Sequence, residues 1–306
     1  MITRSYVWVL VVAMLIGGAC GLKAESDAES LTAGTLKKLH GDFKFTEGPA
    51  VDTTGAIYFT DIPNNRIHKW TLDGKLETVR ENSGGTNGLM FDEKGNLVMC
   101  EMAARRVTQL DPEGKLTVLA ERCDDKRLNS PNDLWIDKAG GIYFTDPWYG
   151  SADDLEQDGR HVYYITPDRS AIKRVADDLV NPNGLIGTAD GKHLYIADHG
   201  DDKTFIYNIQ PDGTLADKRL FAQQGSDGVA LDVRGNLYLT TDRVNVYNPK
   251  GERIETIEVP EVPANLTFGA TDHNQLFITA RTSIYAVPMT VRGQEMPIDR
   301  ISAKTR

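Results

Sequence analysis

Six side chains that carry carboxylate or carboxamide oxygens recur along the chain at intervals of 38 to 51 residues. They are Glu47, Asn87, Asn132, Asn183, Asp227 and Asn265. Oxygen donors of this kind, with only two formal negative charges among them, suit a hard divalent cation, above all calcium. If the six positions lie in one ring, the sequence predicts a cation site inside that ring.

A simpler explanation of the same six positions is turn chemistry. Asn and Asp are common in turns that lead into strands, and this preference accounts for many of the Asn-Gly pairs. It does not account for the absence of Ser, Thr, Lys and apolar residues from all six positions. We therefore favour the cation ring.

Each of the six residues opens a repeated sequence pattern. The third copy, NDLWIDKAGGIYFTD from Asn132, has an apolar step, a turn with Asp and Gly, and a β-rich run. Glu47 and Asp227 begin the similar phrases EGPAVDTTGAIYFTD and DGVALDVRGNLYLTTD. Alternating apolar residues around a Gly-containing turn are typical of a β-hairpin. The chain therefore repeats one hairpin six times.

The spacing of these hairpins predicts the fold. A period of 40 to 50 residues is typical of propeller blades. A second pair of strand-like runs, such as 66–70 and 76–79, completes a four-stranded unit. We therefore predict an all-β fold, a six-bladed β-propeller over residues 31–290, in which the first strand of each blade lines the channel. Residues 31–45 should supply an outer strand to the last blade, and residues 291–306 are interpreted as a polar C-terminal tail.

The N-terminus has the pattern of a secretory signal peptide. Arg4 precedes the ten-residue apolar run 7–16, which is too short to span a membrane. Small residues follow, and cleavage after Ala19 or Ala24 fits residues 1–24 as the signal. Cys20 resembles the lipidated cysteine of a bacterial lipobox, although Gly17 stands where Leu or Val is usual. We expect an exported protein, periplasmic or secreted, with a lipid anchor at Cys20 as an alternative.

Composition excludes several function classes. The formal net charge of −10 disfavours nucleic acid and anionic membranes as partners. Beyond the N-terminal segment only Cys100 and Cys123 remain, which is too few for a disulfide framework. Neither a zinc-protease motif, a serine-hydrolase elbow nor a phosphate loop occurs. The expected partner is a small molecule, and the chain is expected to be a monomer or a small homo-oligomer.

Several further residues are candidates for contact with that molecule. Arg127 precedes Asn132 closely and is predicted near the channel mouth, with a salt bridge as the alternative. Trp148 and Tyr149 precede a long acidic loop and could flank a substrate or pack under the loop. Arg105 and Arg106 are interpreted as structural. His199 ends an inner hairpin and is expected at the end of the channel opposite the oxygen ring.

Long phrases of the sequence resemble the gluconolactonase, regucalcin and senescence-marker-protein family. They include FTEGPAVD, RLNSPND, IYFTDPWYG, NPNGLIGTADGKHLYIAD and SDGVALDVRGNLYLT, and the match covers about residues 45–287. The resemblance implies a six-bladed propeller with one catalytic divalent ion, usually calcium, with zinc, manganese or magnesium as alternatives. It implies Glu47, Asn132, Asn183 and Asp227 as metal ligands and Asp227 as the catalytic residue.

The resemblance also implies the reaction. Many members of the family hydrolyse sugar lactones, and Arg127 matches an arginine that binds substrate. Apart from the resemblance, we expect Asn87, Trp148 and Tyr149 to contact the substrate as well. The chain departs from many bacterial members at Met102, where they have a histidine, and this difference bears on substrate choice. The alternatives are phosphotriester or aryl-ester hydrolysis at the same metal site, and a propeller that binds a ligand without catalysis.

Overall fold

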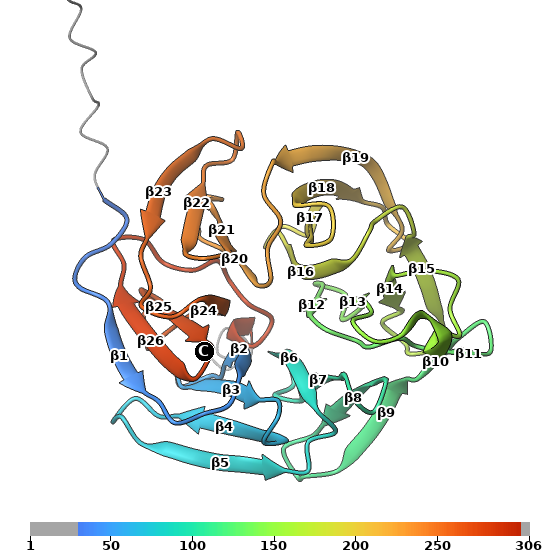
Figure 1. The fold of residues 1–306 in the computed structure, drawn as a ribbon, viewed down its shortest axis with the longest axis horizontal. Coiled ribbons are helices and arrows are strands. Elements are labelled where there is room, and N and C mark those ends of the chain that lie inside the picture. The colour runs from blue at the N-terminus through green and yellow to red at the C-terminus, as the bar shows by residue number, and fades with distance from the viewer. Residues whose placement is uncertain (1–29, 301–306) are drawn as a thin grey trace, which may run out of the picture.

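The protein is a six-bladed β-propeller, as the repeats predict. The computed structural model describes residues 30–300, and residues 1–29 and 301–306 lie outside the described part of the chain. Six four-stranded sheets and one two-stranded hairpin make up the described chain, and the sheets are arranged radially around a channel (Figure 1). The predicted signal peptide and Cys20 fall outside the described residues, so export and lipidation stay predictions.

The first three blades run outward from the channel in chain order. Blade one contains β2 (Thr46–Val51), β3 (Ile57–Asp61), β4 (Arg66–Trp70) and β5 (Leu76–Glu81). Blade two contains β6 (Thr86–Phe91), β7 (Leu97–Glu101), β8 (Arg106–Leu110) and β9 (Leu116–Ala120). Blade three contains β12 (Leu134–Ile136), β13 (Ile142–Asp146), β14 (His161–Ile165) and β15 (Ile172–Ala176).

The remaining blades have the same order, apart from the last strand. Blade four contains β16 (Pro182–Gly187), β17 (His193–Asp198), β18 (Lys203–Ile209) and β19 (Leu215–Ala222). Blade five contains β20 (Val229–Leu231), β21 (Leu237–Thr240), β22 (Val244–Tyr247) and β23 (Arg253–Ile257). Blade six contains β24 (Pro263–Gly269), β25 (Gln275–Ala280), β26 (Ser283–Pro288) and, from the other end of the chain, β1 (Lys37–His40).

The pairing of β1 with β26 closes the propeller. The two strands are antiparallel, with Lys37 opposite Ala286 and Lys38 opposite Tyr285. Figure 1 shows β1, in blue, as the outermost strand beside β26 and β25, in red. This confirms the prediction that the N-terminal segment completes the last blade. Closure by the two ends of the chain leaves no gap in the circle of blades.

The inner hairpins of blades one, two, three and five turn through a short Asp-x-x-Gly motif. In blade one, Asp52 Oδ1 accepts hydrogen bonds from Thr54 N at 2.8 Å and Ala56 N at 3.1 Å. Gly55 adopts a positive φ of 90°, which glycine tolerates without strain. The same carboxylate-to-backbone bonds recur at Asp92 and Asp232. The Asp-x-x-Gly motif of the sequence is therefore the turn of these hairpins.

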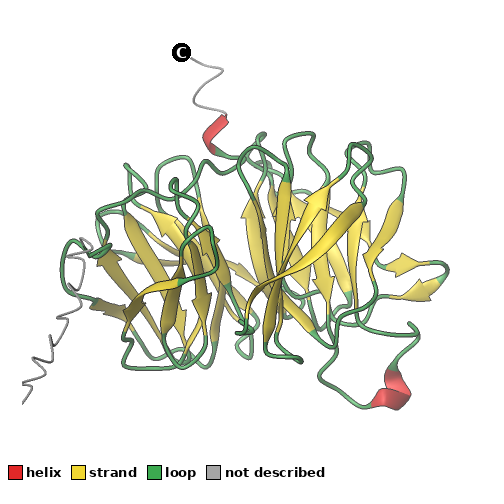
Figure 2. Cartoon of the chain, turned by 90° about the horizontal axis from the view of Figure 1, so that it is seen from above, coloured by secondary structure: helices red, strands yellow, loops and turns green. Residues whose placement is uncertain are grey.

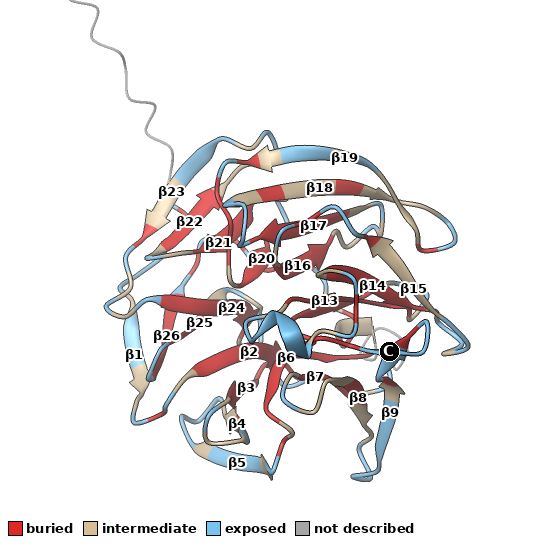
Figure 3. Ribbon diagram, turned by 45° about the vertical axis from the view of Figure 1, so that its right-hand side comes forward, coloured by how far each residue is buried: buried red, intermediate tan, exposed pale blue. Residues whose placement is uncertain are grey.

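Burial is greatest in the strands nearest the channel. Every residue of β2, β6, β16 and β24 is buried, whereas β5 has mostly exposed residues, and Figure 3 shows this gradient from red to pale blue.

Figure 2 shows that the C-terminal segment leaves one face of the propeller, whereas the short helix η1 (Ala152–Asp154) lies at the opposite face. The two faces can therefore carry different functions.

Successive inner strands approach each other closely because glycine follows the oxygen-bearing residue in most blades. A Cβ atom on Gly48 would lie 2.0 Å from the Asn87 carbonyl oxygen, and one on Gly184 would lie 2.5 Å from the Asp227 carbonyl oxygen. No larger side chain fits at either position. The glycines therefore let the first residues of neighbouring blades gather around the channel.

A buried carboxylate fixes the segment that enters three of the inner strands. Asp146, at the end of β13, accepts hydrogen bonds from Asn129 N and Ser130 N, both at 2.7 Å. Asp198 at the end of β17 binds Val180 N and Asn181 N in the same way, and Asp61 at the end of β3 binds Lys44 N and Phe45 N. Because each second bonded residue precedes a ring residue by two positions, these bonds set where the ring side chains lie.

Blade five achieves the same placement with a carboxylate from another blade. Asp202 Oδ1 accepts a hydrogen bond from Gly225 N at 2.8 Å, and Gly225 lies two residues before Asp227. All four residues that the family resemblance assigns as metal ligands therefore follow a backbone N–H group held by a carboxylate. Hydrogen bonds to a charged acceptor are among the stronger ones in proteins, so the ring is positioned firmly.

The described part of the C-terminal segment is not a polar tail. Gln294 is buried, and its side chain bonds Gly187 O at 2.8 Å and Ala189 N at 3.0 Å. Val291 and Ile298 are buried as well. The sequence interpretation weighed the polar residues of the segment and overlooked these apolar side chains, which pack against the inner strands. Residues 301–306 lie outside the described residues.

Two smaller sequence predictions can also be compared with the structure. Cys100 and Cys123 are both buried free thiols, in agreement with the expected absence of a disulfide framework. Arg106 forms the expected structural ion pair, with its Nε 2.6 Å from Glu101 Oε2.

Within residues 30–300, no helix has the length and apolar character needed to cross a membrane.

Replacing Asp146 tests the carboxylate bonds that position the ring. Burial raises the pKa of Asp146 to about 7, so the group is ionised above that pH. Asp146→Asn removes one of two acceptors for buried N–H groups, which is expected to lower the free energy of unfolding by about 1–3 kcal/mol at about pH 8. Urea unfolding measures the change, with Asp153→Asn on the exposed loop as the control. Equal stability of the two variants would show that these bonds do not hold the segment.

Candidate active site

The six oxygen-bearing residues lie where the inner strands of the six blades begin. Glu47, Asn87, Asn183 and Asn265 belong to β2, β6, β16 and β24, whereas Asn132 and Asp227 lie two positions before the start of β12 and β20. All are buried except Asp227, which is half-buried. The ring predicted from the repeats is thus assembled from all six blades around one end of the channel.

Two carboxylates of this ring lie side by side. Asp227 lies close enough to Glu47 for its charge to shift the pKa of that group, and the Asn183 side chain in turn lowers the pKa of Asp227. Burial, and then the negative charge of Asp227, raise the pKa of Glu47 well above its usual range. Burial likewise raises the pKa of Asp227, although the nearby His199 opposes this rise. Two carboxylates that share one buried space repel each other unless a proton or a cation lies between them.

Tyr149 and Trp148 hold the Asn183 segment from the neighbouring blade. Asn183 Nδ2 donates a hydrogen bond to the Tyr149 hydroxyl at 2.8 Å, and Trp148 N donates one to Asn181 Oδ1 at 3.1 Å. The first bond uses the nitrogen of the Asn183 amide and so leaves its oxygen for another partner. Tyr149 therefore orients one of the ring amides, whereas the Trp148 indole donates to Ser151 O of the acidic loop at 2.6 Å. Contact of either aromatic side chain with a substrate stays a prediction.

Asn87 and Asn132 present amides without a protein partner. Among residues 30–300, no hydrogen bond to either side-chain amide is found, although both residues are buried. Their backbones are well held, since Asn132 N donates to Thr145 O at 2.9 Å and Asn132 O accepts from Gly88 N at 2.8 Å. The backbone of these residues is thus held in place, and the side-chain amide groups are available to bind a ligand.

Arg127 lies on a hairpin outside the six blades, and its expected contact with substrate stays a prediction. It belongs to the two-stranded hairpin of β10 (Arg122–Cys123) and β11 (Lys126–Arg127), at the rim in Figure 1. Its side chain is exposed, and its backbone N–H group donates to Glu156 Oε2 at 2.8 Å. Arg105 instead contacts Trp148, with its guanidinium 5.1 Å from the centre of the Trp148 ring.

A cavity of about 460 Å³ opens beside Asp227. Its lining includes Phe45, His199, Arg281 and Thr241. The predicted position of His199 at the far end of the channel is therefore wrong. In an antiparallel hairpin the end of the second strand lies beside the start of the first, and Pro182 indeed pairs with Asp198. His199 accordingly lies at the same end as the ring.

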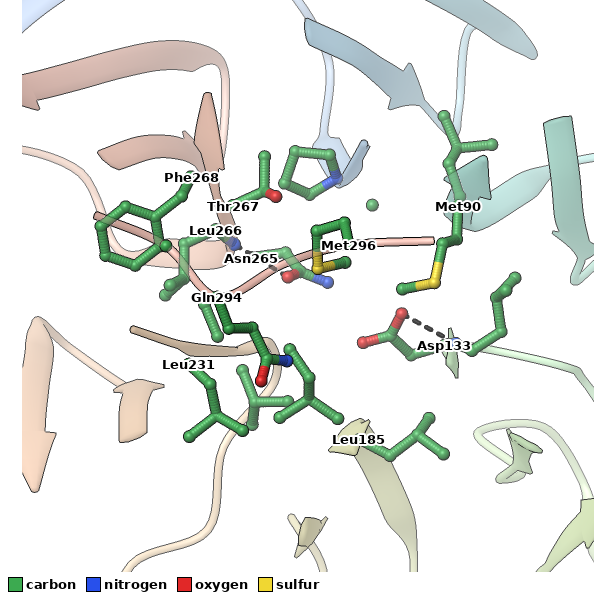
Figure 4. Close-up of a pocket in the computed structure, with 18 residues that line it drawn as sticks. Met90, Asp133, Leu185, Leu231, Asn265, Leu266, Thr267, Phe268, Gln294 and Met296 are labelled. Atoms are coloured by element: carbon green, nitrogen blue, oxygen red, sulfur yellow. Dashed lines mark hydrogen bonds between the residues drawn. The ribbon is translucent and has the colours of Figure 1, made fainter. Parts of the chain in front are cut away.

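Asp133 is a buried acid that the sequence reading missed. It follows Asn132 at a position that is glycine in four of the other repeats, and this contrast was visible in the sequence. Its side chain and that of Asn265 point into a second cavity of about 40 Å³, which Gln294 and Met296 close (Figure 4). Burial raises the pKa of Asp133 to about 7. Asn265 thus turns toward this inner cavity.

The donor set of the ring fits a hard divalent cation. Within the described residues, no group of three or more His, Cys, Asp and Glu side chains could hold a metal ion. The ring instead offers two carboxylates, Glu47 and Asp227, and neutral amide oxygens from Asn132 and Asn183. Carboxylate and amide oxygens are the ligands of calcium, whereas zinc sites in proteins are built largely from nitrogen and sulfur donors.

Known proteins share both the sequence and the fold. A gluconolactonase from Zymomonas mobilis is 27% identical over 288 residues, which cover 82% of this chain and 80% of the relative. The solved structure of a gluconolactonase from Xanthomonas campestris matches with a TM-score of 0.78 at 31% identity, over 83% of this chain and 89% of the other.

A third protein shares the fold at lower identity. The calcium-binding protein regucalcin from Agrobacterium tumefaciens matches with a TM-score of 0.74 at 19% identity, over 88% of this chain and 98% of the other. The family model described as the SMP-30/Gluconolactonase/LRE-like region matches residues 45–282, which include all six ring residues. The chain therefore belongs to the SMP-30/gluconolactonase family.

Proposed function

We propose that this protein is a lactonase that opens a sugar lactone with the help of one divalent cation, most favourably calcium. The observation that carries the proposal is the pair of carboxylates, Glu47 and Asp227, which lie together with the Asn183 amide at the mouth of the channel. Family membership supports the reaction, since the relatives include proteins named gluconolactonase and lactonase.

Charge balance supports the cation. Glu47 and Asp227 contribute two negative charges when ionised, which a divalent ion balances, and the amides of Asn132 and Asn183 add neutral oxygens. When bound, such an ion would polarise the lactone carbonyl and stabilise the oxyanion that forms there. Calcium suits this set better than a smaller ion because it accepts flexible oxygen ligands from several elements.

Asp227 is the residue best placed to move the proton. It is half-buried and lines the cavity that opens to solvent, whereas Glu47 is buried. In the reaction, a water oxygen bonds to the carbonyl carbon as Asp227 takes a proton from that water. The ring C–O bond then breaks, and the leaving oxygen takes up a proton, which Asp227 can return. The product is an open-chain hydroxy acid.

Asp227→Asn tests this role. The substitution keeps the shape and one coordinating oxygen but removes the basicity, so kcat for lactone hydrolysis should fall by about 10²-fold or more under saturating calcium. Asp242→Asn is the control, because Asp242 lines the same cavity but is paired with Arg243 at 2.6 Å. Near-normal kcat in Asp227→Asn would show that another group accepts the proton.

Tyr149→Phe tests how Asn183 is oriented. Without the hydroxyl, the Asn183 amide loses the acceptor for its nitrogen and can rotate its oxygen away from the cation. Loss of such a supporting bond is expected to weaken calcium binding by about 10-fold or more. Calorimetric titration with calcium measures it, and Tyr247→Phe is the control, since the Tyr247 hydroxyl bonds Gln224 instead. An unchanged affinity with a raised KM would assign Tyr149 to substrate contact alone.

Calcium affinity should depend on pH. The pKa values of Glu47 and Asp227 are raised mainly by burial, so protons compete with the cation at a higher pH than for exposed carboxylates. The protonated groups are neutral and bind a cation poorly. Affinity should therefore be full above the raised pKa values and fall as the pH is lowered through them, at a higher pH than for exposed carboxylates. Calorimetric affinity that falls only near the usual range of an exposed carboxylate, about pH 4, would contradict the raised pKa values of the pair.

A further inference from the structure

Arg281 lies in the cavity beside Asp227 with no ion-pair partner among residues 30–300. It occupies the tight turn between β25 and β26 and lines the 460 Å³ cavity. Its guanidinium lies 5.5 Å from the centre of the Phe45 ring, which lines the same cavity. A guanidinium on an aromatic face keeps its N–H groups directed sideways, where a ligand can reach them.

The backbone of Arg281 is held in an unfavourable conformation. Its φ is +46°, in the left-handed region where glycine or asparagine is usual in hairpin turns. The conformation is fixed by its carbonyl oxygen, which accepts hydrogen bonds from Thr46 N at 2.8 Å and from Thr46 Oγ1 at 3.3 Å. Because Thr46 immediately precedes Glu47, the turn is tied to β2, the strand that carries the Glu47 carboxylate of the proposed cation site. A strained residue fixed beside a site suggests a functional side chain.

The acids near Arg281 have other partners. Asp242 is paired with Arg243 at 2.6 Å, Asp202 accepts the bond from Gly225 N, and Glu261 binds Thr282 and Tyr285. Asp227, which also faces the cavity, belongs to the cation site. The positive charge of Arg281 is therefore left for a ligand in the cavity.

We propose that Arg281, stacked on Phe45, forms a subsite for a carboxylate of the substrate, so that the preferred substrate is a lactone with a second, ionised acid group. This inference rests on the proposed function. Apolar residues, among them Val262 and Pro263, line the same cavity and can cover the carbon atoms between the two reactive ends. The planar guanidinium matches a carboxylate with two parallel hydrogen bonds. A phosphate dianion fits less well, because a single cation faces it and Asp202 and Asp242 lie nearby.

Two lactones that differ in one group test the subsite. D-Glucono-1,4-lactone and D-glucaro-1,4-lactone share the same ring, but the terminal carbon carries a hydroxyl in the first and a carboxylate in the second. The wild-type protein with calcium should show a higher kcat/KM for the glucaro compound. That preference should shrink at high ionic strength, because salt screens the attraction between Arg281 and the carboxylate.

Variants identify the residue responsible. In Arg281→Gln the ratio of the two kcat/KM values should fall by about 10- to 100-fold, the range for a hydrogen-bonded charged group. Arg281→Lys keeps the charge and should retain part of the preference. Arg253→Gln removes the same charge from the exposed outer strand β23 and should leave the ratio unchanged. An equal loss for both lactones in Arg281→Gln would overturn the subsite, since Arg281 would then act on the acid group that every lactone releases.

Binding separates this inference from the proposed function. Calorimetry with the open-chain products should show tighter binding of D-glucarate than of D-gluconate, and Arg281→Gln should abolish the difference. Absence of hydrolysis of both lactones would refute the proposed function. Equal binding of the two products by the wild-type protein would refute the subsite, whether or not the lactones are hydrolysed. A stronger preference for a 6-phosphorylated lactone than for the carboxylate would also overturn it.

Discussion

The close approach of Glu47 and Asp227 is the constraint on which the rest of the site depends. A buried and a half-buried carboxylate in one space are unfavourable without a compensating charge, yet the fold brings them together. Glycines such as Gly48 and Gly184 let neighbouring inner strands touch, and carboxylates such as Asp202 fix the backbone just before each ring residue. A bound cation would attract both carboxylates and so offset the repulsion between them. The backbone geometry that brings the two carboxylates together therefore favours cation binding.

The sequence predicted the parts of the structure that repeat. Hairpins, blades, the closing strand β1 and the oxygen ring all follow from one pattern found six times, because each copy has the same relation to the channel. The parts of the structure that do not repeat could not be predicted from this pattern. The backbone pairing that places His199 beside the ring, the turn that carries Arg281 and the burial of Gln294 depend on contacts between distant segments, which no local pattern reports.

The distinction between repeated and non-repeated residues also distinguishes the residues for the reaction from the residues for substrate choice. In the function we propose, the residues predicted from the repeats supply the oxygens that hold the cation. The residues that would tune that site and choose the substrate instead differ from blade to blade, such as Tyr149, which orients Asn183, and Arg281 beside Phe45. Arg281 has no acidic ion-pair partner within residues 30–300 of a chain whose formal net charge is −10, and this is why we assign it to the choice of substrate.

The most direct test of the central claim is a crystal structure of the protein with calcium bound. The account predicts a single ion at the channel mouth, with oxygens of Glu47, Asn132, Asn183 and Asp227 at about 2.3–2.6 Å from it. It also predicts that the Asn183 nitrogen still faces the Tyr149 hydroxyl. An ion bound elsewhere, or a ring that contains no ion at saturating calcium, would contradict the account.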